Sequence, residues 1–583
     1  MGNFFKIFFA SLLALIVFCL IGVFLIAALV SGFTQKDKPE IEKQSVLVLD
    51  LGQHFKEQKD KGLLTNFSIG DEGATPGLYD VVRLIGKAKE DKNISGILIT
   101  ANDNGNGFAS SDELRRALLD FKTSKKFIIA HGDVVTQKAY FVANVADKFY
   151  ANPVGAVDWS GFSSELVFIK GTLDKLDIQP QIFYAGKFKS ATEPLRVDKM
   201  TPENKLQTGV WLNNLYNYFL VRTAEARGVD TATLHNLANT AAIQKSEDAV
   251  TYKLIDGVKY DDEVKDEIKK RLGLDKYDKL NMISIGDYAD ATSIYKSGSS
   301  RIGIIYAEGD IVDGEGSSDN IGGDNFRKII RKMRLDKSIK AIVLRINSGG
   351  GSALASENIW RELSLAKADK PLVVSFGDVA ASGGYYIGCG ADSIFALPNT
   401  ITGSIGVFGI IPNMQGFFNN KLGVTFDGVK TATYADAGAL YRPMNEAEKR
   451  LTQQGVDRIY LQFKQRVAQG RKKDINFVDS IAQGRVWSGD DALRIGLVDK
   501  IGNLQEAINC AARLAKVSDY GLREYPQSKG LMETLFNKTK ESPQAFIKNE
   551  VGEKNYLIYR QLMQVQQMCG SVQARLPFQF SIH

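Results

Sequence analysis

Histidine and cysteine are scarce in this sequence, with four of each among 583 residues. The cysteines show no CxxC spacing and no accompanying histidine cluster, so the sequence predicts neither a metal site nor a disulfide framework. With so few histidines, any serine-based catalysis must recruit one of them or use a different base. These residues are Cys19, Cys389, Cys510 and Cys569, and His54, His131, His235 and His583.

The chain also lacks a strong excess of charge of one sign. It has 73 basic and 67 acidic residues, which give a net charge of +6 without any basic block. This pattern does not suggest nucleic acid as a partner. Apolar residues make up 44% and charged residues 24%, as in an ordinary globular protein, and the length allows several domains.

Only one long apolar run is present, and it lies near the N-terminus. Residues 7–33 contain no charged residue, and a run of that length can cross a bilayer as a helix. It is longer than the apolar core of a cleavable signal peptide, so we expect an uncleaved signal anchor within residues 1–43. The rest of the chain should then lie on one side of the membrane. The charge difference across the run is too small to fix which side that is.

Two copies of one pattern make up most of the remaining chain. Residues 91–101 match residues 336–346, and residues 131–153 match residues 376–398 at the same spacing. Short apolar strands alternate with helices, which predicts an α/β fold with mostly parallel strands. The predicted domains are a first repeat over 44–295, a second repeat over 296–514 and a helical appendage over 515–583.

Within the repeats, individual elements can be placed by residue range. Asn445 and Thr201 suit helix N-caps, and Pro202 suits the first turn that follows Thr201. In the second repeat, apolar runs predict strands at 301–306, 341–346, 372–375 and 393–396, and helices are predicted at 325–334, 352–368 and 445–469.

Ser382 is the strongest candidate nucleophile. It follows a predicted buried strand and stands between Ala381 and the pair Gly383-Gly384. Small neighbours let a substrate approach the hydroxyl, and a serine at a strand-to-helix turn can be flanked by backbone N–H groups that stabilise an oxyanion. A glycine-rich turn with an incidental serine is the alternative interpretation.

The two copies differ where this chemistry would occur. Gln137 stands at the position of Ser382, and Lys138 and Ala139 replace the two glycines. The first copy has therefore lost the candidate nucleophile and its open turn, whereas the second copy keeps both.

A serine hydroxyl needs an adjacent base, and the first copy offers two lysines, Lys187 and Lys189, just before Glu193. A lysine can act as a base when burial lowers its pKa towards neutrality. Serine–lysine pairs are a known variant of the catalytic triad. Two solvated loop lysines are the alternative interpretation.

Taken together, these motifs resemble the long form of bacterial signal peptide peptidase A, also called protease IV, in peptidase family S49. The resemblance runs from the apolar segment to about residue 515. It is carried by residues 347–352 (NSGGGS), 377–386 (GDVAASGGYY), 402–407 (TGSIGV), 189–194 (KSATEP) and 484–487 (GRVW).

The resemblance implies two tandem domains like those of the crotonase and Clp protease superfamily. It implies a serine protease that degrades cleaved signal peptides and similar apolar peptides, with Ser382 as nucleophile and Lys189 as general base. Ser404 would help to hold the lysine amine, and the N–H groups of Gly383 and Gly350 would form the oxyanion hole. The resemblance also implies no cofactor, a homotetramer, and a single-pass protein of the bacterial inner membrane with its bulk in the periplasm.

Some residues leave alternatives open. Gly349 stands where the family usually has proline, which should loosen this loop. Lys430 in the second copy is the runner-up base, because short forms of the family carry serine and lysine in one domain. Lys189 is preferred for its fuller sequence context, and Lys187 is the weaker neighbour. His131 aligns with Phe376, which suggests a structural role.

Two other classes of function compete with a protease. The first is a non-catalytic, membrane-anchored scaffold that keeps the fold, and the retention of Ser382 and Ser404 with both glycine turns argues against it. The second is an acyl-CoA enzyme of the crotonase type. The predicted anchor and the serine–lysine pair disfavour that class, and retention of CoA ligands would test it.

Overall fold

The computed structural model describes residues 4, 6–18, 21–22, 39–59, 75–294, 297–527 and 571–576. Residues 6–18 and 21–22 are helical. In this described part of the chain, no helix is both long enough and apolar enough to cross a membrane. Within the predicted anchor over residues 7–33, residues 19–20 and 23–33 lie outside the described residues.

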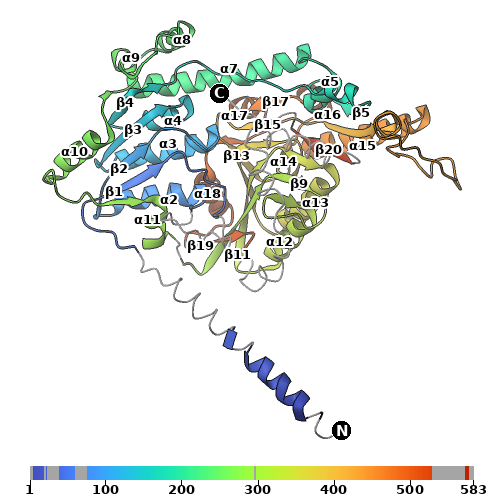
Figure 1. The fold of residues 1–583 in the computed structure, drawn as a ribbon, viewed down its shortest axis with the longest axis horizontal. Helices are drawn as coiled ribbons and strands as arrows, with labels where there is room; N and C mark the ends of the chain where they lie inside the picture. Colours follow the sequence, from blue (N-terminus) through green and yellow to red (C-terminus); the bar gives the residue numbers. More distant parts are fainter. Residues whose placement is uncertain are drawn as a thin grey trace.

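The first repeat contains a parallel six-stranded sheet (Figure 1). The strands at residues 45–50, 94–100 and 127–135 are apolar runs that are buried on both faces over most of their length, as expected for a parallel sheet covered by helices. Helices α2 (Leu78–Glu90), α3 (Phe108–Lys122) and α4 (Gln137–Ala143) pack against it. In spatial order the strands are β6 (Gly257–Val258), β4 (Lys148–Val157), β3 (Phe127–Val135), β2 (Ile94–Thr100), β1 (Ser45–Asp50) and β7 (Met282–Ser284).

The second repeat contains an eight-stranded sheet, parallel except for the pair formed by β15 and β17. All four strands predicted from apolar runs are present, and three of them extend beyond the predicted ranges. They are β8 (Ser300–Glu308), β11 (Ile339–Ser348), β13 (Leu372–Ala381) and β14 (Ser393–Ala396). The other four are β15 (Ile401–Gly403), β17 (Val486–Ser488), β18 (Lys500–Ile501) and β19 (Tyr520–Tyr525). The α/β prediction is confirmed for both repeats.

The three helices predicted in the second repeat are also present, as α12 (Gly323–Leu335), α13 (Ala353–Asp369) and α15 (Glu446–Arg471). Asn445 caps α15 in a capping box with Glu448. In the first repeat, the Thr201 side chain caps α7 (Pro202–Arg227), a helix that runs along both halves of the molecule (Figure 1).

A third sheet joins segments from both repeats and from the C-terminal region. Strand β5 (Gln179–Ala185) of the first repeat pairs antiparallel with β16 (Val407–Asn413) of the second over its whole length. Beyond β16 the order continues through β20 (Val572–Arg575), β12 (Gly350–Ser352), β9 (Asp310–Val312) and β10 (Asn320–Gly322). This sheet crosses the boundary predicted between the repeats.

The region expected to form a helical appendage, residues 515–583, differs from that prediction where it is described. Residues 520–525 form β19, which extends the second sheet beside β8, and residues 572–575 form β20. Burial explains the first case, because Tyr520 and Leu522 pack on an apolar cluster that includes Ile302. The rest of the range, 528–570 and 577–583, lies outside the described residues.

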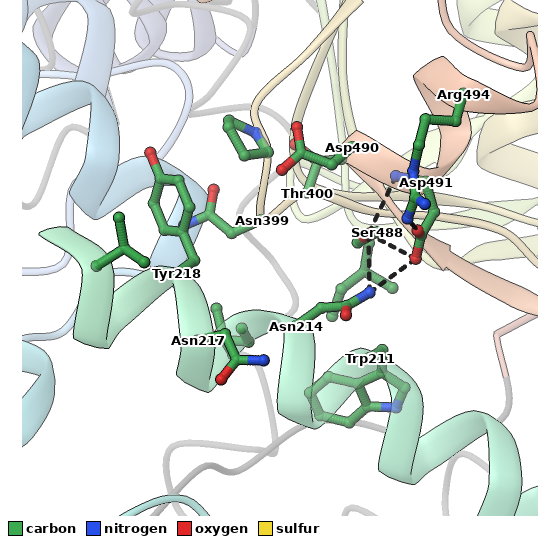
Figure 2. Close-up of a pocket in the computed structure, with 14 residues that line it drawn as sticks. Trp211, Asn214, Asn217, Tyr218, Asn399, Thr400, Ser488, Asp490, Asp491 and Arg494 are labelled. Carbon is green, nitrogen blue, oxygen red and sulfur yellow. Dashed lines mark hydrogen bonds and ion pairs between the residues drawn. The ribbon is translucent and has the colours of Figure 1, made fainter. Parts of the chain in front are cut away.

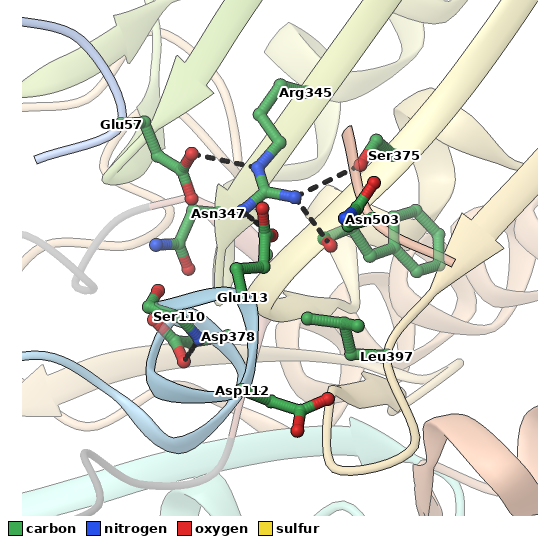
Figure 3. Close-up of polar contacts among 12 residues, drawn as sticks. Glu57, Ser110, Asp112, Glu113, Arg345, Asn347, Ser375, Asp378, Leu397 and Asn503 are labelled. Atoms are coloured by element: carbon green, nitrogen blue, oxygen red, sulfur yellow. Dashed lines mark hydrogen bonds and ion pairs between the residues drawn. The ribbon is translucent and has the colours of Figure 1, made fainter. Parts of the chain in front are cut away.

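Arg345 on β11 ties the two repeats together in the interior (Figure 3). Its Nε donates to Glu57 at 2.8 Å and its Nη2 donates to Glu113 on α3 at 2.7 Å, and all three side chains are buried. The remaining nitrogen donates to the Ser375 hydroxyl and the Phe376 carbonyl. Burial raises the pKa of Glu113 to about 7, against the opposing effect of Arg345.

Candidate active site

Ser382 lies between the end of β13 and the start of α14 (Gly383–Gly388). Its φ of +55° is in a region that non-glycine residues rarely adopt, and such strain persists only where surrounding contacts impose it. Here the Ser382 N–H donates to the Gly403 carbonyl at 2.8 Å, and the Ser382 carbonyl accepts from Tyr386 at 2.8 Å. The side chain is fully buried.

Lys189 follows β5, and the pairing of β5 with β16 in the third sheet brings this part of the first repeat to Ser382. After β5 ends at Ala185, the chain turns at Gly186 (φ +105°), and the Lys189 N–H donates to the Gly186 carbonyl at 3.0 Å. The Lys189 side chain is 1% exposed. Its Nζ lies 2.8 Å from Ser382 Oγ, across 193 positions of sequence.

Ser404 completes the surroundings of the amine. Lys189 Nζ lies 3.0 Å from Ser404 Oγ and 3.1 Å from the Ser404 carbonyl oxygen. A neutral amine has two N–H donors and one lone pair. The two N–H groups can bond to Ser404, which leaves the lone pair to accept the hydroxyl proton of Ser382.

Burial lowers the pKa of Lys189 well below its usual value, and desolvation is the cause. The amine is therefore biased towards the neutral form, which is the form that can act as a base. The arrangement can withdraw a proton from a buried serine hydroxyl without histidine. The described histidines lie elsewhere; His131, for example, contacts the Lys259 carbonyl at 3.0 Å through Nε2.

The two glycines expected at the oxyanion hole are neighbours in space. A methyl group on Gly350 would come within 2.6 Å of the Gly383 backbone nitrogen, so the two backbones meet in a way that only glycine permits. Gly350 also has a φ of +98°. Its N–H donates to Ser348 Oγ at 3.1 Å, while the Gly383 N–H follows Ser382 directly at the first turn of α14.

Lys430 and Lys187 have different surroundings from Lys189. The side chain of Lys430 is 45% exposed and pairs with Asp436 at 2.6 Å, and the structure does not bring it to Ser382. Lys187 lies on the surface beside the Phe188 ring, 5.2 Å from its centroid.

In the first repeat, Gln137 fills the position equivalent to Ser382. Its side-chain amide donates to the Gly161 carbonyl and accepts from the Gly161 N–H, both at 2.9 Å. The glutamine side chain therefore closes this position with two hydrogen bonds, where the second repeat keeps a hydroxyl.

Sequence reasoning missed the residues that hold the Lys189 segment. Gln207 on α7 is buried and donates to the Phe188 carbonyl at 3.0 Å and to Ser190 Oγ at 2.8 Å. Gly484 (φ +74°) packs so closely that a methyl group there would lie 2.7 Å from Lys189 Cβ. The GRVW stretch was a signal for Gly484, but nothing in the sequence pointed to Gln207.

Comparison with known proteins relates this site to a family. The family described as "Peptidase family S49" matches twice, over residues 120–275 and 364–518. The chain belongs to peptidase family S49. It is therefore a serine protease with two S49 domains in tandem. The first matched range contains Lys189 and Gln137, and the second contains Ser382 and Ser404.

Relatives of this S49 protein cover most of its length. "Protease 4" of Haemophilus influenzae is 34% identical over 550 residues, which is 90% of this chain and 89% of that protein. "Protease 4" of Salmonella typhi is 35% identical, over 81% and 77% of the two chains. "Serine protease SPPA, chloroplastic" of Arabidopsis thaliana is 33% identical, over 74% and 64%.

Among solved structures, a ClpP1 mutant from Listeria monocytogenes matches at 15% identity and a TM-score of 0.24. The match covers 35% of this chain and 94% of that one. A likeness of this size supports no conclusion about the fold, so the expected kinship with the Clp superfamily stays a prediction.

A separate pocket of about 250 Å³ lies between α7 and the second repeat of this S49 protein (Figure 2). Asn214 of α7 donates to Asp491 at 2.7 Å at its edge, and Asp490 lines its wall. Neither Ser382 nor Lys189 lines it. In the described ranges, no group of three or more histidine, cysteine, aspartate or glutamate residues could hold a metal ion.

Proposed function

We propose that this S49 protease is a membrane-anchored endopeptidase that degrades cleaved signal peptides and similar apolar peptides with a serine–lysine dyad. The contact of 2.8 Å between Lys189 Nζ and Ser382 Oγ is the observation that carries this proposal. Neutral Lys189 accepts the Ser382 proton as the hydroxyl attacks the substrate carbonyl. The Gly383 N–H, with a backbone donor near Gly350, stabilises the oxyanion.

The second half of the reaction uses the same groups. Protonated Lys189 gives its proton to the leaving amine as the peptide C–N bond breaks, which leaves an acyl group on Ser382. Water, deprotonated by Lys189, then releases the acyl group. Ser404 keeps the amine in position throughout, because both of its oxygens lie within 3.1 Å of Nζ.

The substrate class and the location are parts of the same proposal. The apolar run over residues 7–33 supports a single-pass anchor in the bacterial inner membrane, and an anchored protease meets apolar peptides at the membrane surface. The resemblance to long-form signal peptide peptidase A supports a homotetramer, signal peptides as substrates, and a location of most of the chain on the periplasmic side.

Peptidase activity of the full chain in detergent tests this proposal. The substrates are a signal peptide and a matched peptide whose apolar core is replaced by glutamine and serine. We expect wild-type protein to cleave the apolar peptide, Ser382→Ala to be inactive and the exposed control Ser480→Ala to keep full activity. Equal activity of Ser382→Ala and wild type would contradict the proposal. Inertness of wild type on every peptide would favour a scaffold.

A further inference from the structure

The pocket between α7 and the second repeat combines an apolar wall with polar groups. Its volume is about 250 Å³, which is less than that of most pockets for drug-sized molecules. Figure 2 shows α7 on one side of it and Asn399 and Asp490 on the other. Trp211, Leu215 and Ile401 supply apolar lining. A molecule that binds here should therefore be small and partly apolar.

Asn399 offers this pocket a buried hydrogen-bond acceptor. The residue is 8% exposed, and its Nδ2 donates to the Phe108 carbonyl at 2.9 Å. Because a carbonyl can only accept, this contact fixes which end of the amide carries the nitrogen. Asn399 Oδ1 is buried and has no hydrogen-bond partner among the described residues. A buried acceptor without a donor costs free energy, and a donor group in the pocket would remove that cost.

Asp490 on α17 (Gly489–Arg494) supplies a negative charge to the same pocket. Within the described ranges its carboxylate has neither a hydrogen bond nor an ion pair. Partial burial and the neighbouring Asp491 raise the pKa of Asp490, so the surroundings disfavour its ionised form. The arginines whose charges act on Asp490 each have another carboxylate partner: Arg494 pairs with Asp491, Arg116 with Asp112 and Arg222 with Glu225. The pocket therefore favours a positively charged molecule.

Helix α7 links this pocket to Lys189. Trp211 lines the pocket one turn after Gln207, the residue that holds the Lys189 segment. Gln207 Oε1 also accepts from the Val486 N–H of β17 at 3.3 Å, and Ser488 at the end of β17 lines the pocket. A shift of α7 relative to β17 would therefore move the backbone that carries Lys189.

Strand β15 links the same pocket to the two serines. Ile401 at its start lines the pocket, whereas the carbonyl of Gly403 at its end accepts from the Ser382 N–H at 2.8 Å. Ser404, the next residue, contacts Lys189 Nζ. Both sides of the pocket thus continue directly into the segments that hold the reacting groups.

We propose that this pocket binds a small organic cation, an amine or guanidinium on a short apolar stem, and that binding raises peptidase activity. The cation donates to Asn399 Oδ1 and pairs with Asp490, while the stem packs against Trp211. By joining α7 to the second repeat, the bound molecule holds Lys189 in position against Ser382. The effect on activity, though not the binding, rests on the proposed function.

A titration of the full chain in detergent, followed by ligand-detected NMR, tests the binding. The probes are n-butylguanidinium and n-butylurea, which have nearly the same shape but differ in charge. We expect wild-type protein to bind n-butylguanidinium with a Kd of about 0.1–1 mM and n-butylurea at least about tenfold more weakly. Absence of n-butylguanidinium binding, or equal binding of the two probes, overturns the proposal.

Two variants locate the bound cation. Asp490→Asn should weaken n-butylguanidinium binding about tenfold, whereas the exposed control Asp519→Asn should bind as wild type does. Equal affinity of Asp490→Asn and wild type would place the cation elsewhere and overturn the proposal. Asn399→Leu should also weaken binding, with folding checked by circular dichroism. If Asn399→Leu does not fold, the result for Asp490→Asn decides.

Cleavage of an apolar peptide by the same preparations tests the effect on activity. Saturating n-butylguanidinium should raise kcat/KM about fivefold in wild type and in Asp519→Asn, and should have no effect on Asp490→Asn. An unchanged rate in wild type removes the effect on activity and leaves the binding site standing. If wild type cleaves no peptide with or without the cation, the proposed function fails, whereas the NMR titration still decides the binding.

Discussion

At the scale of single residues, the surroundings of two lysines two positions apart decide their chemistry. Lys187 reaches the surface, whereas Lys189 turns inward to Ser382 and Ser404. The strand–serine–glycine pattern was enough to make Ser382 a candidate nucleophile from the sequence. Local sequence could not separate the lysines, because the contact that does so joins residues 193 positions apart. Only the family resemblance favoured Lys189.

Burial of Lys189 as a neutral amine should lower the stability of the folded protein while it supports catalysis. Between its lowered pKa and the ordinary lysine value near 10.4, the unfolded chain binds one more proton at this residue than the folded chain does. The free energy of unfolding should therefore rise with pH across this window. Lys189→Met should remove that slope, unfold at a higher temperature at neutral pH and lose about 10² to 10⁴ in kcat/KM.

Thermal unfolding from pH 6 to pH 10 measures this effect, with the exposed Lys187→Met as control. The increase in unfolding temperature of Lys189→Met over wild type should become smaller as pH rises. Lys187→Met should show the same pH dependence of unfolding temperature as wild type. A gain that stays constant from pH 6 to pH 10 would show that Lys189 is charged in the folded protein as it is in the unfolded chain.

At the scale of elements, β5 is the strand that brings the first repeat to the site. Helices and buried parallel strands could be predicted because their apolar runs are local. The third sheet could not, since the pairing of Val407 with Ala185 joins two repeats and leaves no local periodic signal. The strand character of residues 520–525 was missed for the same reason, because it depends on pairing with β8.

The turn after β5 should be sensitive to a single methyl group. Gly186 has a φ of +105°, and a Cβ there would lie 2.5 Å from the Gln483 carbonyl carbon. Gly186→Ala should cost about 1–3 kcal/mol of stability and lower kcat/KM about tenfold by shifting Lys189. Gly209→Ala is the control, because it has open space within α7 and alanine favours helix. Steady-state kinetics and thermal melts measure kcat/KM and stability for both variants. Equal values for Gly186→Ala and Gly209→Ala would contradict this account.

At the scale of the whole molecule, buried charge holds the two repeats in register, so that Lys189 and Ser382 face one another. Arg345 of the second repeat bonds to Glu57 and Glu113 from the N-terminal half. A further link joins Asp378 to Ser110, whose N–H donates at 2.9 Å. Local patterns did not predict these contacts either, because their partners lie more than 200 positions apart.

Arg345→Leu should lower the free energy of unfolding by about 3–5 kcal/mol, because it leaves two buried carboxyl groups without their cation. The loss should grow as pH rises through about 7, where Glu113 ionises. Arg327→Leu is the control, since it removes an exposed pair with Asp324 and should cost no more than about 1 kcal/mol. Urea unfolding at pH 6 and pH 8 measures these changes. An equal loss of stability in Arg345→Leu and Arg327→Leu would contradict this account.

The central claim is that a lysine from the first repeat serves a serine in the second. The most direct test compares kcat/KM on an apolar peptide for Lys189→Ala, Lys430→Ala and wild type, with folding checked by circular dichroism. The account predicts a loss of about 10² to 10⁴ for Lys189→Ala and wild-type activity for Lys430→Ala. Loss of activity in Lys430→Ala with retention in Lys189→Ala would contradict it, because the second repeat would then hold a complete site of its own.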